Sequence, residues 1–217
     1  MRTKGTLAAI TLVLISYCSS ASSDVCELVA GNLLQDPMFL QRKPTGVLQY
    51  WASSQHAGEP SFELEFDSGE LTITKTGTQP WFYFRQTVEV EQLVGKKLAL
   101  TAELKLDMEP QQRRQGFIVG GGIKMVARSS SLQGRKLLLR SVLDHEPHAG
   151  KTDWYPIRVV IELPKGSSTL DVGFLHQADG TLQVRNPSLQ LVDESRGPCA
   201  ISPNAILGVP RATSGLR

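Results

Sequence analysis

The densest group of reactive side chains is the segment 144–148, which reads Asp-His-Glu-Pro-His. Two imidazoles and two carboxylates within five residues are a donor set that a transition metal can bind. Pro147, however, excludes the helical geometry of a His-Glu-x-x-His zinc motif, and the histidine spacing differs from that motif as well. Because the sequence offers no assignable third ligand, we interpret this segment as a solvated loop and predict no metal site.

Signatures of catalysis are missing from the rest of the sequence. There is no Gly-x-Ser-x-Gly elbow, and Gly120–Gly122 lacks the lysine and the helix of a phosphate-binding loop. The carboxylates that fall on predicted strands belong to polar strand faces, where a β-domain keeps its charges; they are Glu103, Glu162 and Asp171. We therefore predict no catalytic residue.

Aromatic side chains carry more information. Trp81, Tyr83 and Arg85 alternate along one predicted strand and so share one of its faces, while Phe82 and Phe84 share the other. Core packing accounts for one aromatic face and not easily for both. An open aromatic face can stack on the apolar side of a sugar ring while polar neighbours bond its hydroxyls.

We predict that these residues form a ligand-binding face. The alternative is that the rings pack at an edge of the core. The two other tryptophans, each beside a tyrosine, share this ambiguity. The predicted ligand-binding set is Trp81, Tyr83, Arg85, Trp51 and Trp154. His176 alternates with apolar residues, and we interpret it as an interior histidine with its hydrogen bonds satisfied.

Most of the chain follows the period of two that is typical of strands. Residues 96–107 show it best, with Leu98, Leu100, Ala102, Leu104 and Leu106 facing one way. Similar strands are expected at 61–66, 70–76, 81–90, 116–128, 154–163, 168–177 and 181–192, and residues 136–143 fit a strand or a short helix. About ten or eleven strands without an amphipathic helix predict an all-β, antiparallel sandwich or barrel.

The sequence predicts two hairpin turns and one β-bulge. Ser68-Gly69 connects two alternating runs and predicts a hairpin, and Ala178-Asp179-Gly180 fits a second hairpin turn with glycine last. At Asn186-Pro187 the apolar face of the last strand slips by one residue, which requires a β-bulge there.

The chain has 217 residues, enough for one domain with a full core. Residues 1–21 combine two basic residues, an apolar run and small residues at 19–21, which is typical of a secretory signal peptide. The bulky Tyr17 before Cys18 disfavours lipid attachment. We predict a signal peptide at 1–21, one domain at 22–199 and a flexible tail at 200–217, in a secreted or periplasmic protein without a membrane span.

The charge of the chain limits the classes of partner that we expect, and its cysteines indicate a disulfide. Arg2 and Lys4 lie in the leader, and without them the 23 basic residues fall to 21, equal to the 21 acidic ones. No basic run indicates nucleic-acid binding. Cys26 and Cys199 remain near the two ends of the domain, and in an oxidising compartment this pair is a disulfide candidate, with two free thiols as the alternative. A bridge would require the first and last strands to be neighbours.

Several of these features together resemble a known family. Asn32-Leu33-Leu34 followed by Asp36-Pro37-Met38-Phe39, the strand 81–90 before Gly95, and the closing strand 182–191 are similar to motifs of galactose-binding-like jelly-roll domains, including the carbohydrate-binding modules of xylanases and glucanases. The resemblance covers residues 32–192. It implies a jelly-roll β-sandwich that holds a glycan on its concave sheet, and in this family a structural calcium ion often lies near the joined chain ends. Asn186-Pro187 departs from the family's closing aspartates, which puts that calcium in doubt.

The sequence thus predicts an exported, non-catalytic glycan-binding protein that uses no cofactor. Arg85 would donate hydrogen bonds to hydroxyls or to an acidic sugar. Two alternatives stay open. One is a structural or protein-interaction subunit of the cell envelope, and the other is a polysaccharide-cleaving jelly-roll enzyme that pairs His145 or His176 with an arginine.

Overall fold

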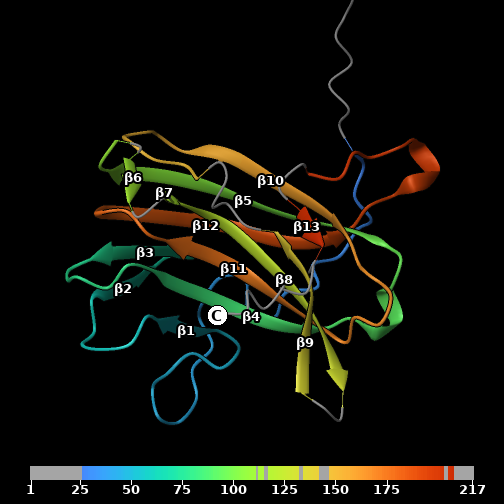
Figure 1. The fold of residues 1–217 in the computed structure, drawn as a ribbon, viewed down its shortest axis with the longest axis horizontal. Helices are drawn as coiled ribbons and strands as arrows, with labels where there is room; N and C mark the ends of the chain where they lie inside the picture. The colour runs from blue at the N-terminus through green and yellow to red at the C-terminus, as the bar shows by residue number, and fades with distance from the viewer. Residues whose placement is uncertain are drawn as a thin grey trace, which may run out of the picture.

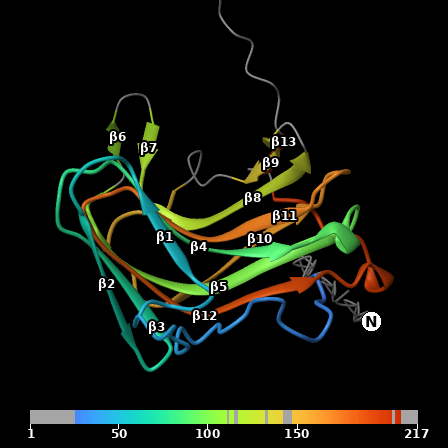
Figure 2. The same ribbon diagram turned by 90° about the horizontal axis from the view of Figure 1, so that it is seen from below.

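The structure of the protein is a computed structural model that describes residues 26–110, 112–114, 117–131, 134–141, 147–202 and 205–207. The predicted signal peptide, 1–21, lies outside these residues. Two antiparallel sheets pack face to face and form a β-sandwich of the jelly-roll type (Figures 1 and 2), which confirms the predicted all-β class. Within the described part of the chain, no helix is long and apolar enough to cross a membrane.

The first sheet has six strands in the order β1-β4-β11-β8-β9-β13. Their bounds are β1 Ala52–Gln55, β4 Phe82–Glu89, β11 Thr169–His176, β8 Gly121–Ser131, β9 Gly134–Ser141 and β13 Ala205–Leu207. Residues 136–143 therefore begin as a strand and not as a helix. β13 falls in the stretch predicted to be a flexible tail, where its backbone pairs with β9.

The second sheet has five strands in the order β10-β5-β12-β3-β2. They are β10 Tyr155–Glu162, β5 Lys97–Met108, β12 Gly180–Leu191, β3 Glu70–Lys75 and β2 Phe62–Asp67. A small separate sheet joins β6, Gln112–Arg114, to β7, Phe117–Val119, and in the described part of the chain 3-10 helices occupy Glu91–Leu93 (η1) and Glu194–Arg196 (η3).

The core lies between the two inner faces. On β5 the side chains of the predicted alternation, Leu98, Leu100, Ala102, Leu104 and Leu106, are all buried. On β11 the same holds for Leu170, Val172, Phe174 and His176. A period of two places every second side chain on the inner face of a strand, so the sequence pattern decides which residues make the core.

The predicted hairpin at Ser68-Gly69 and the predicted bulge at Asn186-Pro187 are confirmed. β2 and β3 form a hairpin through Ser68 and Gly69, whose φ angles of 48° and 85° are those of a tight turn that follows the twist of the strands. In β12 the register with β5 shifts between Arg185 and Ser188, so one extra residue of β12 is accommodated there. Asn186, with φ 52°, takes the left-handed conformation at this bulge.

The predicted hairpin at Ala178-Asp179-Gly180 is wrong. This segment joins β11 of the six-stranded sheet to β12 of the five-stranded sheet, so it crosses between the layers. β11 already pairs with β4 on one edge and β8 on the other, which leaves no edge for β12. Gly180 approaches the backbone of β5 closely, since an added Cβ would lie 2.8 Å from the Cα of Met108.

The segment Asn32–Leu34, the first of the motifs that resemble the jelly-roll family, is irregular and lies beside β12. Leu33 N–H donates to the Leu189 carbonyl at 2.8 Å, and the Asn32 side chain donates to the Pro187 carbonyl while accepting from the N–H of Leu189. The asparagine therefore holds the start of the domain against the bulge of the last strand.

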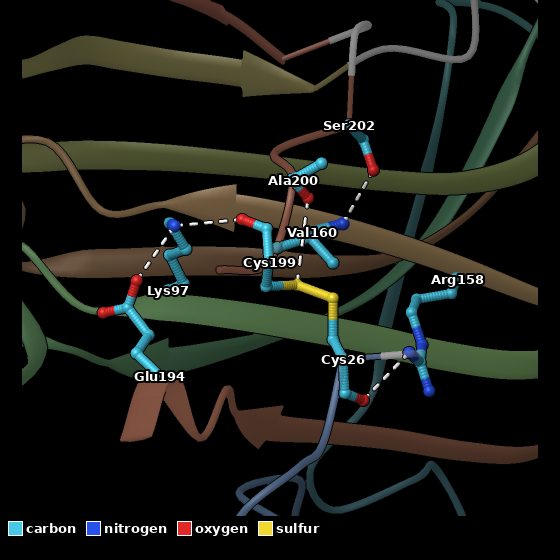
Figure 3. The surroundings of a disulfide bond; sticks show 8 residues. All are labelled: Cys26, Lys97, Arg158, Val160, Glu194, Cys199, Ala200 and Ser202. Atoms are coloured by element: carbon cyan, nitrogen blue, oxygen red, sulfur yellow. Dashed lines mark hydrogen bonds and ion pairs between the residues drawn. A yellow bond between two sulfur atoms is a disulfide. The ribbon is translucent and has the colours of Figure 1, made fainter. Parts of the chain in front are cut away.

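The predicted disulfide between Cys26 and Cys199 is present, with the two Cα atoms 5.3 Å apart (Figure 3). Leu28 pairs with Val192, so the ends of the domain are neighbours, as the bridge requires. Around it, Lys97 Nζ donates to the Cys199 carbonyl at 2.9 Å and Arg158 donates to the Cys26 carbonyl at 3.2 Å. The bridge thus fastens both ends of the domain onto the five-stranded sheet.

Candidate functional site

The candidate site lies on the outer face of β4, β11 and β8, the central strands of the six-stranded sheet. Trp81 precedes β4, and Tyr83 and Arg85 follow it at every second position, so the structure brings these three predicted residues to one face. Phe82 and Phe84 point the other way and are buried in the core. This is the two-sided arrangement that the alternation indicated.

Tyr83 is only 5% exposed although it faces outward. Its hydroxyl donates to the Lys124 carbonyl at 3.0 Å, so the ring reaches from β4 across β11 to β8. Gly173, the β11 partner of Lys124, approaches the backbone of β4 closely, since an added Cβ would lie 2.7 Å from the Cα of Arg85. Two cations flank the ring, with Lys124 Nζ 4.7 Å and the Arg85 guanidinium 5.7 Å from its centroid.

The surroundings of Tyr83 keep its phenol protonated. Burial, and to a smaller extent the Asp171 carboxylate, raise the pKa of Tyr83 well above its usual value. The hydroxyl is therefore a permanent donor to Lys124. The structure gives Tyr83 a bracing role between three strands and leaves little of its ring open to a ligand.

Trp81 is half-buried and stands at the edge of a surface hollow of about 300 Å³. Apolar side chains and a glutamine line the hollow together with two cations; the full set is Trp81, Lys124, Val126, Arg128, Leu137, Leu175 and Gln177. Gln177 has a buried Oε1 atom without a hydrogen-bond partner in the described part of the chain. An indole beside an apolar floor and polar groups is an arrangement that suits a sugar ring.

The charged groups of this face are connected. Arg85 donates to the Ser54 hydroxyl on β1 at 2.9 Å. Asp171 is buried, accepts a hydrogen bond of 2.6 Å from the Thr87 hydroxyl, and lies 3.5 Å from the Nε of Arg128. The carboxylate is therefore neutralised within the face and is not presented to a ligand.

The structure places the two other predicted tryptophans away from this face. Trp51 is 5% exposed in the core, where its ring stacks on Phe84 at 5.1 Å and its indole N–H donates to the Asp36 carbonyl. Trp154 precedes β10 at the other sheet, and the Arg185 guanidinium lies 4.2 Å from its ring centroid. Neither ring lines the hollow, so we do not include them in the site.

His176 is fully buried, as the sequence predicted, but it is only half satisfied. Nε2 bonds the Gly180 carbonyl at 3.0 Å, while Nδ1 has no partner in the described residues. Burial lowers the pKa of His176 to about 4, so the ring is neutral at pH 7. Because it lies inside the sandwich, it cannot reach a polysaccharide as a catalytic base.

The histidine-rich segment lies partly outside the described residues, since 144–146, including His145, are not among them. The backbone of His148 pairs with that of Gly121, and Pro147 lies against Gly120, where an added Cβ would approach it to 2.7 Å. The glycine triplet thus marks a close backbone approach. Among the described residues, no three His, Cys, Asp or Glu side chains gather where they could hold a metal ion.

Sequence reasoning missed the β8, β9 and β11 contributions to the hollow. Lys124, Val126 and Arg128 alternate on β8, and Leu175 and Gln177 continue the outward positions of β11. The alternation was visible in the sequence. Nothing local, however, indicated that β8 and β4 flank β11 in one sheet, because these strands are far apart in the chain.

No protein-family model matches this sequence, and no curated protein matches it either. Several solved structures share the fold at low identity. The chain is similar to a family 4 carbohydrate-binding module (14% identity, 65% of this chain and 86% of that one, TM-score 0.42). It is also similar to the CBM22-1 xylan-binding domain from Paenibacillus barcinonensis Xyn10C (12%, 67% and 87%, 0.39) and to TmCBM61 in complex with β-1,4-galactotriose (12%, 74% and 98%, 0.41).

These three structures are carbohydrate-binding modules or domains. With TM-scores below 0.5 they carry no argument about ligand, and one fold serves many functions. The functional argument therefore rests on the side chains of this chain.

Proposed function

We propose that this protein binds a glycan, without cleaving it, on the outer face of β4, β11 and β8. The observation that supports this is the half-buried Trp81 beside a hollow that apolar side chains, a glutamine and two cations line together. Trp81 would stack on a sugar ring, and Gln177, Lys124 and Arg128 would bond its oxygens. Relative to the sequence prediction, the proposed site keeps Trp81, does not include Arg85 among the residues that line the hollow, and gives Tyr83 a bracing role.

The proposal includes export. Cys26 and Cys199 are joined, and disulfides persist in oxidising compartments such as the periplasm and the extracellular space. A predicted signal peptide at 1–21 agrees with this location. The proposed partner is a polysaccharide on or outside the cell surface.

A comparison of two tryptophan variants tests the proposal. Trp81→Ala and Trp154→Ala remove the same ring from the outer faces of different sheets, and both residues are half-buried. Removal of a central aromatic anchor costs about 2 kcal/mol, so we expect Trp81→Ala to weaken glycan binding roughly thirtyfold. Trp154→Ala should bind as the wild type does.

The measurement is affinity electrophoresis or a glycan array with the mature protein, after circular dichroism has shown that each variant folds. Equal binding by wild type and Trp81→Ala would refute the proposed site. Failure to bind any glycan, combined with co-purification of a protein partner, would favour the protein-interaction role instead.

A further inference from the structure

We propose that the glycan is anionic and that Lys124 and Arg128 bind its carboxylate or sulfate groups. This inference rests on the proposed function and names the class of ligand for the same hollow. It follows from the charges that line the hollow, from the single side-chain hydrogen bond that Arg128 makes to the described residues, and from the spacing of the two cations on β8.

The hollow has an excess of positive charge. Among the described residues that line it, Lys124 and Arg128 are cationic and none is acidic. Arg85 adds a third cation to the same face. Asp171 lies there too, but it is 6% exposed and held by Thr87 and Arg128, and Glu89 lies at the end of β4, two strands away from Arg128. An anion entering this hollow would meet Lys124 and Arg128, while the buried Asp171 carboxylate compensates one of the two charges, so the excess among these three groups is one positive charge.

The Arg128 guanidinium has N–H donors that no described residue uses. Its Nε faces Asp171 at 3.5 Å, and within the described residues its two terminal nitrogens make no hydrogen bond. About a third of the side chain, 33%, is exposed. A guanidinium fixed at Nε and open at its outer edge can bind the two oxygens of a carboxylate or sulfate in parallel. Asp171 therefore positions Arg128 and does not compete for that edge.

The spacing of the cations indicates a polymer. Lys124 and Arg128 are four residues apart on one face of β8, which places their Cα atoms about 13 Å from each other. Val126, 3% exposed, lies between them as apolar floor. Two separate cations with a flat apolar stretch between them match a sugar chain that carries acidic groups on different residues.

Two pairs of polymers that differ only in charge test the inference. One pair is polygalacturonate and its methyl ester, which separates carboxylate from neutral sugar. The other is dextran sulfate and dextran, which does the same for sulfate. Dissociation constants are measured by titration calorimetry for the wild type, Lys124→Gln, Arg128→Gln, Arg128→Lys and, as a matched control, Lys165→Gln, whose lysine is exposed in the turn before β11.

We expect the charged member of one pair to bind more tightly than its neutral partner, and that pair identifies the acidic group. Loss of one charged hydrogen bond should weaken this binding about tenfold in Lys124→Gln and in Arg128→Gln. Lys165→Gln should bind normally, and Arg128→Lys should retain more binding than Arg128→Gln. Raising the salt concentration from about 0.05 to 0.5 M should weaken the charged complex only.

Three outcomes would overturn the inference. Equal binding of charged and neutral polymers, still lost in Trp81→Ala, would leave glycan binding intact and remove its anionic character. A loss in Lys165→Gln as large as in Lys124→Gln would mean attraction by overall charge and not by the hollow. If no polymer binds, charged or neutral, the proposed function fails together with the inference.

Discussion

The outer faces of the two sheets carry similar residues in different states. Each has a tryptophan just before a strand and arginines nearby. On the five-stranded sheet, Arg185 is matched by acids, because it bonds Glu103 at 2.7 Å and lies 3.5 Å from Glu70. Its guanidinium also covers the ring of Trp154. On the six-stranded sheet, Trp81 borders a hollow, and the terminal nitrogens of Arg128 are open within the described residues.

The five-stranded sheet is also covered in part by the segments around Cys26 and Cys199, the two ends of the domain. Cys26 and Cys199 pack there with Ala99, Val160 and Val192 in a second small apolar cluster. One outer face thus carries the disulfide that fastens the domain, and the other carries the hollow that we propose as the ligand site. The comparison teaches that residue type alone does not make a binding site; what matters is whether neighbours have already used the ring and the charge.

Removal of the disulfide should have the largest effect. The bridge spans 173 residues, and a chain-entropy model assigns such a loop about 5 kcal/mol as an upper value. We expect the Cys26→Ala/Cys199→Ala double variant to unfold at much lower urea concentration, while glycan affinity of the folded protein stays unchanged. Reduction of the wild type is the control. A loss of affinity in the folded variant would mean that the disulfide on the five-stranded sheet also supports glycan binding on the six-stranded sheet.

The interior histidine should make the protein sensitive to acid. The folded-state pKa of His176 is about 4, below its ordinary 6.5, so the unfolded chain binds a proton that the folded protein does not. Stability is therefore lost as pH falls from about 6.5 towards 4, by roughly 3 kcal/mol at most. His176→Gln should remove this slope in urea titrations at several pH values, and His56→Gln, at an exposed position, should not. Equal slopes in all three proteins would mean that His176 is not the source of the acid sensitivity.

Tyr83→Phe tests whether Tyr83 stabilises the outer face of the six-stranded sheet or contacts the ligand there. It removes the hydrogen bond to the Lys124 carbonyl, and we expect a loss of about 1 kcal/mol in unfolding free energy. Because the ring is buried, glycan affinity should change far less than in Trp81→Ala. A loss of affinity equal to that of Trp81→Ala would make Tyr83 a ligand contact after all.

Glu103→Gln should have the smallest effect. Hydrogen bonds from Asn186 and Arg185 lower the pKa of Glu103, so its contribution is present above the ordinary pKa of 4.5 and disappears as pH falls through the lowered value. Since the group is exposed, solvent and salt weaken the pair. Thermal melts at neutral pH should show a slight decrease that high salt abolishes, with glycan binding unaffected. A clear loss of binding would mean that the five-stranded face takes part.

Much of the fold could be predicted from local pattern. The alternation in β5 and β11 identified their inner residues, Ser68-Gly69 identified a hairpin, and the one-residue slip at Asn186-Pro187 identified a bulge. Each of these follows from side-chain direction or turn chemistry within a few residues. The hairpin predicted at Ala178–Gly180 was wrong, because a turn sequence does not reveal whether the chain returns beside the same strand or crosses to the other sheet.

The sequence by itself determined most of the long strands, their inner faces, the cysteines able to pair and the outward set of Trp81, Tyr83 and Arg85, but it missed β1 and β13. Only the tertiary structure decided that Tyr83 is covered, that Trp51 is core and that Lys124 and Arg128 join Trp81 around one hollow. The physical reason is that side-chain direction is a local property of a strand. Exposure and charge balance, in contrast, depend on neighbours such as β8 and β11, which the chain supplies from distant positions.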